Sequence, residues 1–281
     1  MTADLQKSKS TSYITSSLDS NVLTLTMNRP KKLNGWTLPM IESLVGAFAE
    51  ASKDDRVKAV ILTGADPYYC AGVDLGGSLK LMHPKKLHQS IKALNERLFN
   101  LFIEFDKPIL IAVNGPAIGA SVTSATLCNG IIASENATFS TPFACLGVPP
   151  EGCSSIHLPR LIGSDNAKRM LGEEGWKPSA EEALNIGLIQ WLEPHVSLLS
   201  KAQTIAKGWV KIGSSRDYLA NATRDELKSI NAKESVAVAD AMLSAAFLKE
   251  QARFFWRKNK KIPSLLFWSL WALRPIWGRL L

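Results

Sequence analysis

One carboxylate stands out because of the residues around it. Glu151 follows a double proline and precedes Gly152 in the stretch 138–155. Because each proline ring fixes its own φ angle, the approach to Glu151 is stiff, and the side chain can be aimed into a cleft. A carboxylate held in this way can act as a general acid and base. The residues from Gly152 onward also read as the first turns of an amphipathic helix, in which Glu151 would merely favour the helix dipole.

Two other segments carry backbone groups that could serve the same reaction. Cys70–Gly77 follows the apolar run Val57–Thr63, and Asn114–Ser121 follows the apolar run Pro108–Val113. Such runs, bounded by turn residues and alternating with helices, predict βα units. Small residues let backbone N–H groups approach a ligand, so two turns aimed at one point could hold a developing oxyanion. Tight packing explains either turn alone, but not both turns together with Glu151.

These three segments together resemble the crotonase, or enoyl-CoA hydratase/isomerase, superfamily. The block Thr-Pro-Phe…Leu-Gly…Pro-Glu-Gly-Cys-Ser-Ser is similar to the Δ3,Δ2-enoyl-CoA isomerase branch found in peroxisomes and mitochondria. The resemblance runs from about Tyr13 to about Lys261 and includes Asn28–Asn34 and Ala180–Ile189. It implies an α/β fold, a spiral of ββα repeats followed by a helical C-terminal region that completes the active site and forms a trimer or a hexamer.

The resemblance also implies an activity. The enzyme would shift a 3-enoyl-CoA double bond to the 2-trans position during β-oxidation of unsaturated fatty acids. Glu151 matches the acid/base that moves the proton, and the two N–H donors for the enolate oxygen fall on Val73 and Ala120. Coenzyme A enters as part of the acyl-CoA substrate, so no separate cofactor and no metal are implied.

Contacts to the CoA ester are implied at several further positions. Ala71, Asp74 and Leu75 lie in the first of the two glycine turns, Cys70–Gly77. Asp74 can also be interpreted as a cap of the following helix. A basic residue near Asn28–Asn34 contacts the nucleotide phosphates in the family, and Lys31 or Lys32 is the candidate. A solvated charged face explains either lysine equally well.

Two positions depart from the hydratase pattern. Family hydratases use two glutamates to activate water, and the matching positions here are Thr123 and Phe143. Neither side chain can act as a general base at neutral pH. Two alternatives stay open: another acyl-CoA enolate enzyme of the hydratase type, or a non-catalytic scaffold with this fold. The presence of Glu151 argues against the scaffold.

The charge and the cysteine content of the chain limit which classes of partner are expected. The net charge is +8, and residues 251–281 hold seven basic side chains and no acid, so the rest of the chain is almost neutral. A nucleic-acid surface is therefore poorly supported. The four cysteines show no metal-type pairing, which favours free thiols in a reducing compartment. Cys153 lies beside Glu151 without a suitably placed histidine, so we interpret it as a packing residue.

The organisation follows from periodicity. We expect a flexible lead over 1–12, a spiral core over 13–200, a helical region over 201–261 and an aromatic-basic tail over 262–281. Within the core, strands are predicted at Val22–Asn28, Val57–Thr63, Ile109–Val113 and near Ile131 and Thr138, and helices at Leu38–Ser52 and His83–Phe105. After Glu151 the pattern is nearly all helical.

The C-terminal tail indicates where in the cell the protein could lie. Residues 262–281 combine three tryptophans with leucines and follow a basic run, which suits peripheral contact with an anionic membrane. Packing on the trimer or over the acyl tunnel is the alternative. The resemblance implies a peroxisomal protein, yet the chain ends Gly-Arg-Leu-Leu rather than Ser-Lys-Leu, which leaves mitochondrial and cytoplasmic locations as alternatives.

Overall fold

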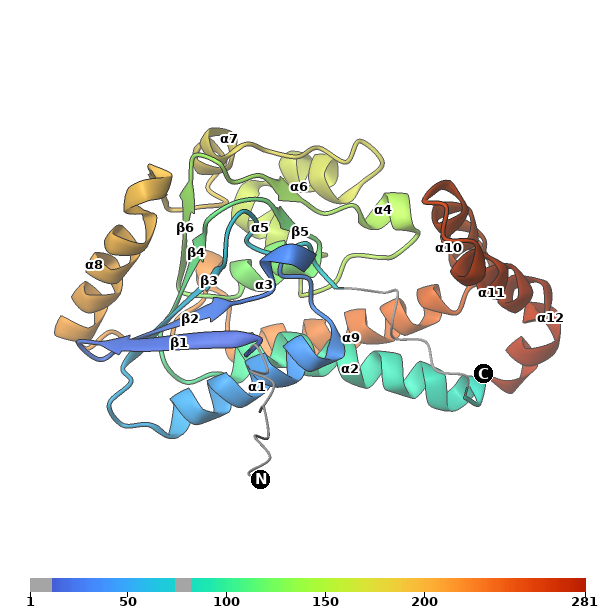
Figure 1. Cartoon of the computed structure of the whole chain (residues 1–281), viewed down its shortest axis with the longest axis horizontal. Helices are drawn as coiled ribbons and strands as arrows, with labels where there is room; N and C mark the ends of the chain where they lie inside the picture. Colours follow the sequence, from blue (N-terminus) through green and yellow to red (C-terminus); the bar gives the residue numbers. More distant parts are fainter. Residues whose placement is uncertain (1–11, 74–81) are drawn as a thin grey trace, which may run out of the picture.

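A six-stranded sheet forms the centre of the molecule (Figure 1). The computed structural model describes residues 12–73 and 82–281. The strand order is β1-β2-β3-β4-β6-β8, in which β1 and β2 pair antiparallel and every later strand joins in parallel. These strands are β1 (Ile14–Asp19), β2 (Val22–Met27), β3 (Ala59–Gly64), β4 (Ile109–Val113), β6 (Gly130–Ser134) and β8 (Trp191–Glu193). A separate small parallel sheet pairs β5 (Ala117–Ile118) with β7 (Phe139–Ser140).

Helices connect and cover the strands. The α-helices are α1 (Leu38–Lys53), α2 (Pro84–Glu104), α3 (Ala120–Thr126), α4 (Phe143–Leu146), α5 (His157–Ile162), α6 (Ser164–Leu171), α7 (Ala180–Asn185), α8 (Leu198–Lys211), α9 (Arg224–Met242), α10 (Ala245–Arg257), α11 (Lys261–Ala272) and α12 (Arg274–Trp277). Short 3₁₀ helices lie at Pro30–Lys32, His195–Ser197, Leu219–Asn221 and Gly278–Leu280.

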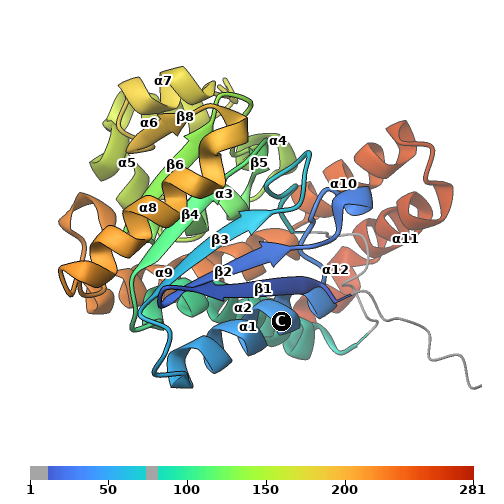
Figure 2. The same cartoon turned by 60° about the vertical axis from the view of Figure 1, so that its left-hand side comes forward.

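Both faces of the main sheet are covered, which explains why its central strands are continuous apolar runs. On one face, α8 crosses the strands and packs against Ile61 of β3 (Figure 2). On the opposite face, Leu62 of β3 lies in one core cluster with Phe48 of α1 and Phe102 of α2. Because side chains alternate along a strand, the neighbouring residues of β3 serve two separate cores.

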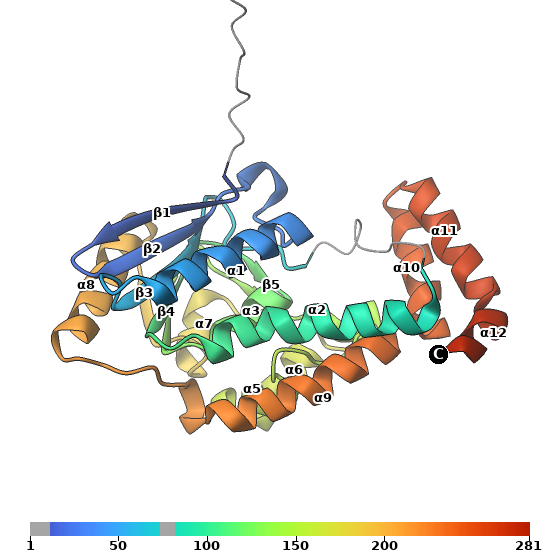
Figure 3. The same ribbon diagram turned by 90° about the horizontal axis from the view of Figure 1, so that it is seen from below.

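Two long helices, α2 and α9, run side by side and antiparallel (Figure 3). His88 contacts Asp240 at one end of the pair at 2.8 Å, and Lys228 contacts Glu104 at the other end at 2.6 Å. Both ion pairs lie at the surface and contribute little stability. The alignment matters more, because it brings polar residues on the facing sides of α2 and α9 together beside the predicted site.

Towards the C-terminus, α10 and α11 form a helical hairpin at the end of α9, and α12 follows it (Figures 1 and 3). Phe255 and Phe267 stack across its seam with ring centroids 5.5 Å apart. The buried Ser264 hydroxyl donates to the Ala252 carbonyl at 2.7 Å. Over the described ranges, no helix is both long enough and apolar enough to span a membrane.

The predicted strands and the two predicted long helices of the core are present, but the helix expected from Gly152 is not. Gly152 and Cys153 adopt positive φ angles of 67° and 65°, and α5 begins only at His157. Glu151 therefore lies outside any helical first turn, and the helix-dipole interpretation of this residue is wrong. The region after Glu151 also contains β8, which the helical pattern missed.

Candidate active site

A cavity of about 350 Å³ lies beside α2, and its walls are mostly apolar. Glu151, Val73 and Ala120 all line it, although they come from three separate segments of the chain. Among the described residues that line this cavity, Glu151 carries the only ionisable side chain. The cavity therefore combines a single acid with two backbone turns in a largely apolar space, as in many enzyme sites for small molecules.

Hydrogen bonds join the two turns on the cavity wall. The Ile118 amide donates to the Cys70 carbonyl at 3.0 Å, and the Ser121 hydroxyl donates to the same carbonyl at 3.1 Å. Gly72, with φ of +81°, packs so closely that an added Cβ would lie 2.6 Å from the Ile118 oxygen. Only glycine fits there, and the tight contact fixes the turns relative to each other.

The Val73 and Ala120 amides are available to a ligand. Ala120 is the first residue of α3, and a first-turn N–H has no acceptor within its own helix. Val73 pairs with Trp36 in an isolated parallel bridge, in which the Trp36 amide donates to the Gly72 carbonyl at 2.8 Å. Within residues 12–73 and 82–281, neither the Val73 nor the Ala120 amide donates to a protein acceptor. Two such donors in an apolar cavity can hold an oxyanion.

A second side chain holds the carboxylate of Glu151. The amide nitrogen Nδ2 of Asn95, on α2, donates to Oε2 of Glu151 at 2.5 Å. The Asn95 oxygen accepts from the Ser235 hydroxyl of α9 at 2.9 Å. This relay fixes the Asn95 amide so that its NH₂ group faces Glu151, and the α2–α9 pair thereby orients the acid.

The surroundings tune Glu151 toward neutral pH. Burial among apolar side chains raises the pKa of Glu151 to about 7, the Asn95 hydrogen bond opposes that rise, and the nearby Glu234 charge adds to it. A carboxyl group with a pKa near the working pH can both accept and return a proton. The site thus supplies the property that a single-base proton shuttle requires.

Glu234 of α9 fixes the backbone that follows Glu151. Its Oε2 accepts from the Cys153 amide at 2.6 Å, and its Oε1 accepts from the Ser155 amide at 2.9 Å. Burial raises the pKa of Glu234, whereas hydrogen bonds from the side chain and the amide of Ser155 and from the amide of Cys153 lower it. At Gly152 an added Cβ would lie 2.4 Å from a ring carbon of Phe99. The segment 151–155, which we call the hinge, is therefore held by Glu234 on one side and by Phe99 on the other.

The two positions that differ from hydratases lie close to the site. Phe143 lines the cavity, and the Thr123 hydroxyl would lie 2.6 Å from a Cβ added at Gly152. That hydroxyl donates weakly to the Ala120 carbonyl at 3.4 Å. Both side chains therefore flank the cavity near Glu151, but neither can take a proton there.

The predicted CoA contacts have mixed positions. Ala71 lines the cavity, and its amide donates to the carbonyl at position 33 at 2.9 Å, which links the first turn to the 3₁₀ helix at Pro30–Lys32. Lys31 and Lys32 are exposed on that helix and do not line the cavity. Asp74 and Leu75 lie outside the described residues.

Cys153 has the environment of a packing residue. Its buried thiol donates to the Leu227 carbonyl at 3.2 Å, and burial raises the pKa of Cys153 well above its ordinary value. The thiolate, which is the nucleophilic form, is therefore disfavoured. All four cysteines are free thiols, and only Cys145 is exposed.

The sequence interpretation missed Asn95, Ser235 and Glu234. The signal for Asn95 was an amide four residues after Ile91, on the apolar stripe of the predicted helix. Ser235 and Glu234 gave no comparable signal, because α9 is only weakly amphipathic and its sequence does not indicate which helix lies against it.

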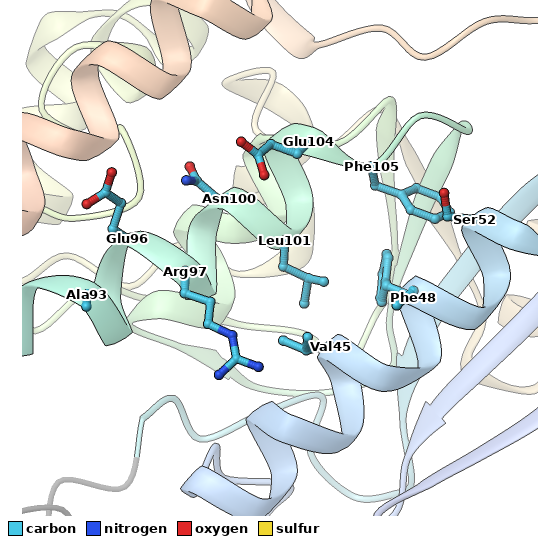
Figure 4. A pocket seen from close by; sticks show the side chains of 11 residues that line it. Val45, Phe48, Ser52, Ala93, Glu96, Arg97, Asn100, Leu101, Glu104 and Phe105 are labelled. Carbon is cyan, nitrogen blue, oxygen red and sulfur yellow. The ribbon is translucent and has the colours of Figure 1, made fainter. Parts of the chain in front are cut away.

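A second groove lies between α1 and α2 (Figure 4). Phe48 and Leu101 form its apolar floor, while Glu96 and Glu104 lie along its α2 side. Arg97 at its edge is bound to Glu42 through hydrogen bonds of 2.7 and 2.9 Å. This groove shares no lining residue with the Glu151 cavity and lacks an acid aimed at free amides, so the Glu151 cavity is the better candidate site.

Comparisons with known proteins identify the family of this chain. Residues 17–258 match the family model Enoyl-CoA hydratase/isomerase. Enoyl-CoA delta isomerase 2 of Rattus norvegicus is 34% identical over 248 residues, covering 86% of this chain and 63% of that protein. Enoyl-CoA delta isomerase 3, peroxisomal, of Mus musculus is 30% identical over 264 residues, covering 91% of this chain and 82% of that protein.

Solved structures show the same fold. The crystal structure of an enoyl-CoA hydratase/isomerase from Pseudoalteromonas atlantica matches with a TM-score of 0.73 at 28% identity, covering 87% of this chain and 97% of that chain. The chain thus spans less than two thirds of the rat isomerase but nearly all of the bacterial protein. It belongs to the enoyl-CoA hydratase/isomerase, or crotonase, family.

Proposed function

We propose that the protein is a Δ3,Δ2-enoyl-CoA isomerase of fatty acid oxidation, with Glu151 as its acid/base. The observation that carries the proposal is the pairing of one carboxylate, whose pKa is raised to about 7, with two free amides on the same apolar cavity. The two relatives that bear the isomerase name support an acyl-CoA isomerase or hydratase type of role.

The proposed reaction proceeds in two proton transfers. The Glu151 carboxylate takes a proton from C2 of a 3-enoyl-CoA, and the electron pair moves onto the thioester oxygen. The Val73 and Ala120 amides stabilise that enolate oxygen, which is where the negative charge develops. Glu151 then returns the proton to C4 as the double bond forms between C2 and C3. Apolar walls limit exchange of the carried proton with water.

Hydration of 2-enoyl-CoA is the second candidate, and the site argues against it. Adding water across a double bond calls for groups that position the water, remove one proton and deliver another. Thr123 and Phe143 supply no second carboxylate near Glu151. Among the described lining residues there is no other ionisable side chain to replace them.

Location and assembly belong to the same proposal. A relative described as peroxisomal supports a peroxisomal location for this protein. We also propose a homotrimer or a dimer of trimers, built through the helical C-terminal half. Light scattering on dilute protein tests the assembly, and a stable monomer would contradict it.

The activity test compares two reactions on one preparation of the full chain. The purified protein is given 3-enoyl-CoA esters of several chain lengths, and formation of 2-enoyl-CoA is measured beside hydration of 2-enoyl-CoA. We expect isomerisation to exceed hydration by at least ~10²-fold, because the second acid is absent. Comparable rates, or hydration alone, would refute the isomerase assignment. Neither activity at any chain length would favour the scaffold.

A further inference from the structure

The turn that joins α10 and α11 has an unusual surface. Trp256, near the end of α10, is 51% exposed, and Ile262, near the start of α11, is 84% exposed. Leu265 continues this apolar surface one turn further along α11 and is also exposed. We call Trp256, Ile262 and Leu265, together with the basic residues between them, the hairpin tip.

The basic side chains of the hairpin tip are exposed and unopposed. Arg257, Lys258, Lys260 and Lys261 lie within five consecutive residues and face solvent. Over residues 12–73 and 82–281, none of the four forms an ion pair with a carboxylate. Residues 251–281 contain no acid at all. The hairpin tip therefore concentrates positive charge around exposed apolar side chains.

The hairpin tip is preformed rather than loose. Asn259 closes the turn with a φ of 56°, and the Lys260 amide donates to the Phe255 carbonyl at 2.9 Å. The ammonium group of Lys261 lies 3.5 Å from the centroid of the Trp256 ring, a cation–π contact that orients the indole. Little conformational freedom is lost when such a surface binds, which favours association.

The position of the hairpin tip leaves it free to meet a flat surface. Helix α10 starts directly after α9 and is 13 residues long, so its far end lies on the order of 20 Å from the end of α9. Figures 1 and 3 show the hairpin to one side of the sheet, beyond the ends of α2 and α9 that meet it. The stacked Phe255 and Phe267 fill the inner seam, so the exposed apolar groups are not needed to hold the hairpin together.

We propose that the hairpin tip docks on an anionic lipid bilayer. Basic side chains beside tryptophan and aliphatic groups suit this interface, because lysine and arginine meet the lipid headgroups while the apolar groups enter the acyl boundary. A second copy of the chain is the competing occupant, because the trimer proposed above is also built through the helical C-terminal half, and the oligomeric state of the variants separates the two. The proposal does not depend on the isomerase activity.

Vesicle co-sedimentation of the full-length protein tests this proposal. One set of vesicles is phosphatidylcholine alone, and the other contains one part phosphatidylserine to two parts phosphatidylcholine. We expect binding to the anionic vesicles only, weakened strongly at high salt because exposed charges are screened. No binding to the anionic vesicles, or equal binding to both sets, would overturn the proposal.

A matched pair of variants locates the surface. Lys261→Gln with Ile262→Ser alters an adjacent Lys-Ile pair in the hairpin tip, and Lys211→Gln with Ile212→Ser alters the same exposed pair at the end of α8. Each basic group near an anionic surface is worth about fivefold in binding, and the inserted isoleucine adds a similar factor. We expect a loss of roughly 20-fold for the first variant and no change for the second.

Control measurements on each variant check its folding and its oligomeric state. Circular dichroism and turnover in the absence of vesicles show whether each variant is folded, and both should match the wild type. Light scattering reports the oligomeric state of each variant. If the hairpin-tip variant changes its oligomeric state, with or without loss of vesicle binding, a second copy of the chain occupies the surface and the lipid proposal is wrong.

Discussion

Replacing Asn95 with leucine should move the pH dependence of turnover. The Asn95 Nδ2 group donates to Glu151 Oε2 at 2.5 Å and stabilises the carboxylate, which opposes the rise in pKa caused by burial. A hydrogen bond to a charged group contributes about 1.5–3 kcal/mol. One pKa unit corresponds to about 1.36 kcal/mol, so the pKa of Glu151 should rise by roughly one to two units in Asn95→Leu.

The consequence for rate follows from the fraction of Glu151 that is ionised. With a pKa of about 7, half of the wild-type sites hold a carboxylate at pH 7. In Asn95→Leu that fraction falls to roughly 1–10%, so kcat/KM at pH 7 should fall by about 5- to 50-fold. The loss should largely disappear at pH values about two to three units higher, because the carboxylate itself is intact.

The assay is kcat/KM for a 3-enoyl-CoA measured from pH 5 to about pH 10. Asn100→Leu is the control, because Asn100 accepts from Asn231 in the same α2–α9 contact but does not touch Glu151. In the control, kcat/KM should fall toward low pH at the same pH values as in the wild type, and we call this fall the acid limb of the profile. An acid limb that stays in place in Asn95→Leu, or a rate that drops equally at every pH, would refute the proposed role of the Asn95 hydrogen bond.

Three further predictions concern the hinge and the acid. Glu151→Gln should stabilise the fold increasingly as pH rises from about 4.5 to 7, because the raised pKa of Glu151 makes folding of the wild type less favourable above its unfolded-state pKa. The gain in the free energy of unfolding, measured with urea, should approach about 3 kcal/mol. A difference that does not change with pH would contradict this prediction. Glu234→Gln should lose roughly 1–3 kcal/mol of stability and reduce kcat more than it raises KM, since one of the two N–H partners is left without an acceptor; unchanged kcat in a folded variant would argue against it. Gly152→Ala should lose at least ~10-fold in turnover because its Cβ meets Phe99, whereas Gly163→Ala, which has a φ of +81° but open space, should keep normal turnover; equal losses would show that backbone strain alone is responsible.

Local patterns in the sequence predicted most of the sheet. The β-branched runs at β3 and β4 are buried on both faces, so their composition is unambiguous. The strand β1 was missed because most of its side chains are exposed and its apolar alternation is weak. β8 was missed because it has only three residues, which is too short for a period to be recognised.

Only the parts of the site that have distinctive local sequence features could be predicted from the sequence. Glu151 and the two glycine turns have distinctive neighbours in sequence, so their proximity could be inferred. The partners of Glu151 and of its hinge could not, because Asn95 and Glu234 lie 56 and 83 positions away, and their roles arise from the antiparallel contact of α2 and α9. The helix expected at Gly152 failed for a similar reason. Glu234 captures the Cys153 and Ser155 amides, and the backbone around Gly152 and Cys153 takes positive φ angles instead of a helical turn.

Turnover of 3-enoyl-CoA by Glu151→Gln, measured together with binding of a non-reactive acyl-CoA, tests directly whether Glu151 carries the proton. Glutamine keeps the shape of the side chain and can still meet the Asn95 amide through its oxygen, but it cannot carry a proton at neutral pH. We expect kcat to fall by at least ~10²-fold while the dissociation constant of the acyl-CoA stays within a few-fold of the wild type. Turnover within a few-fold of the wild type would show that another group moves the proton.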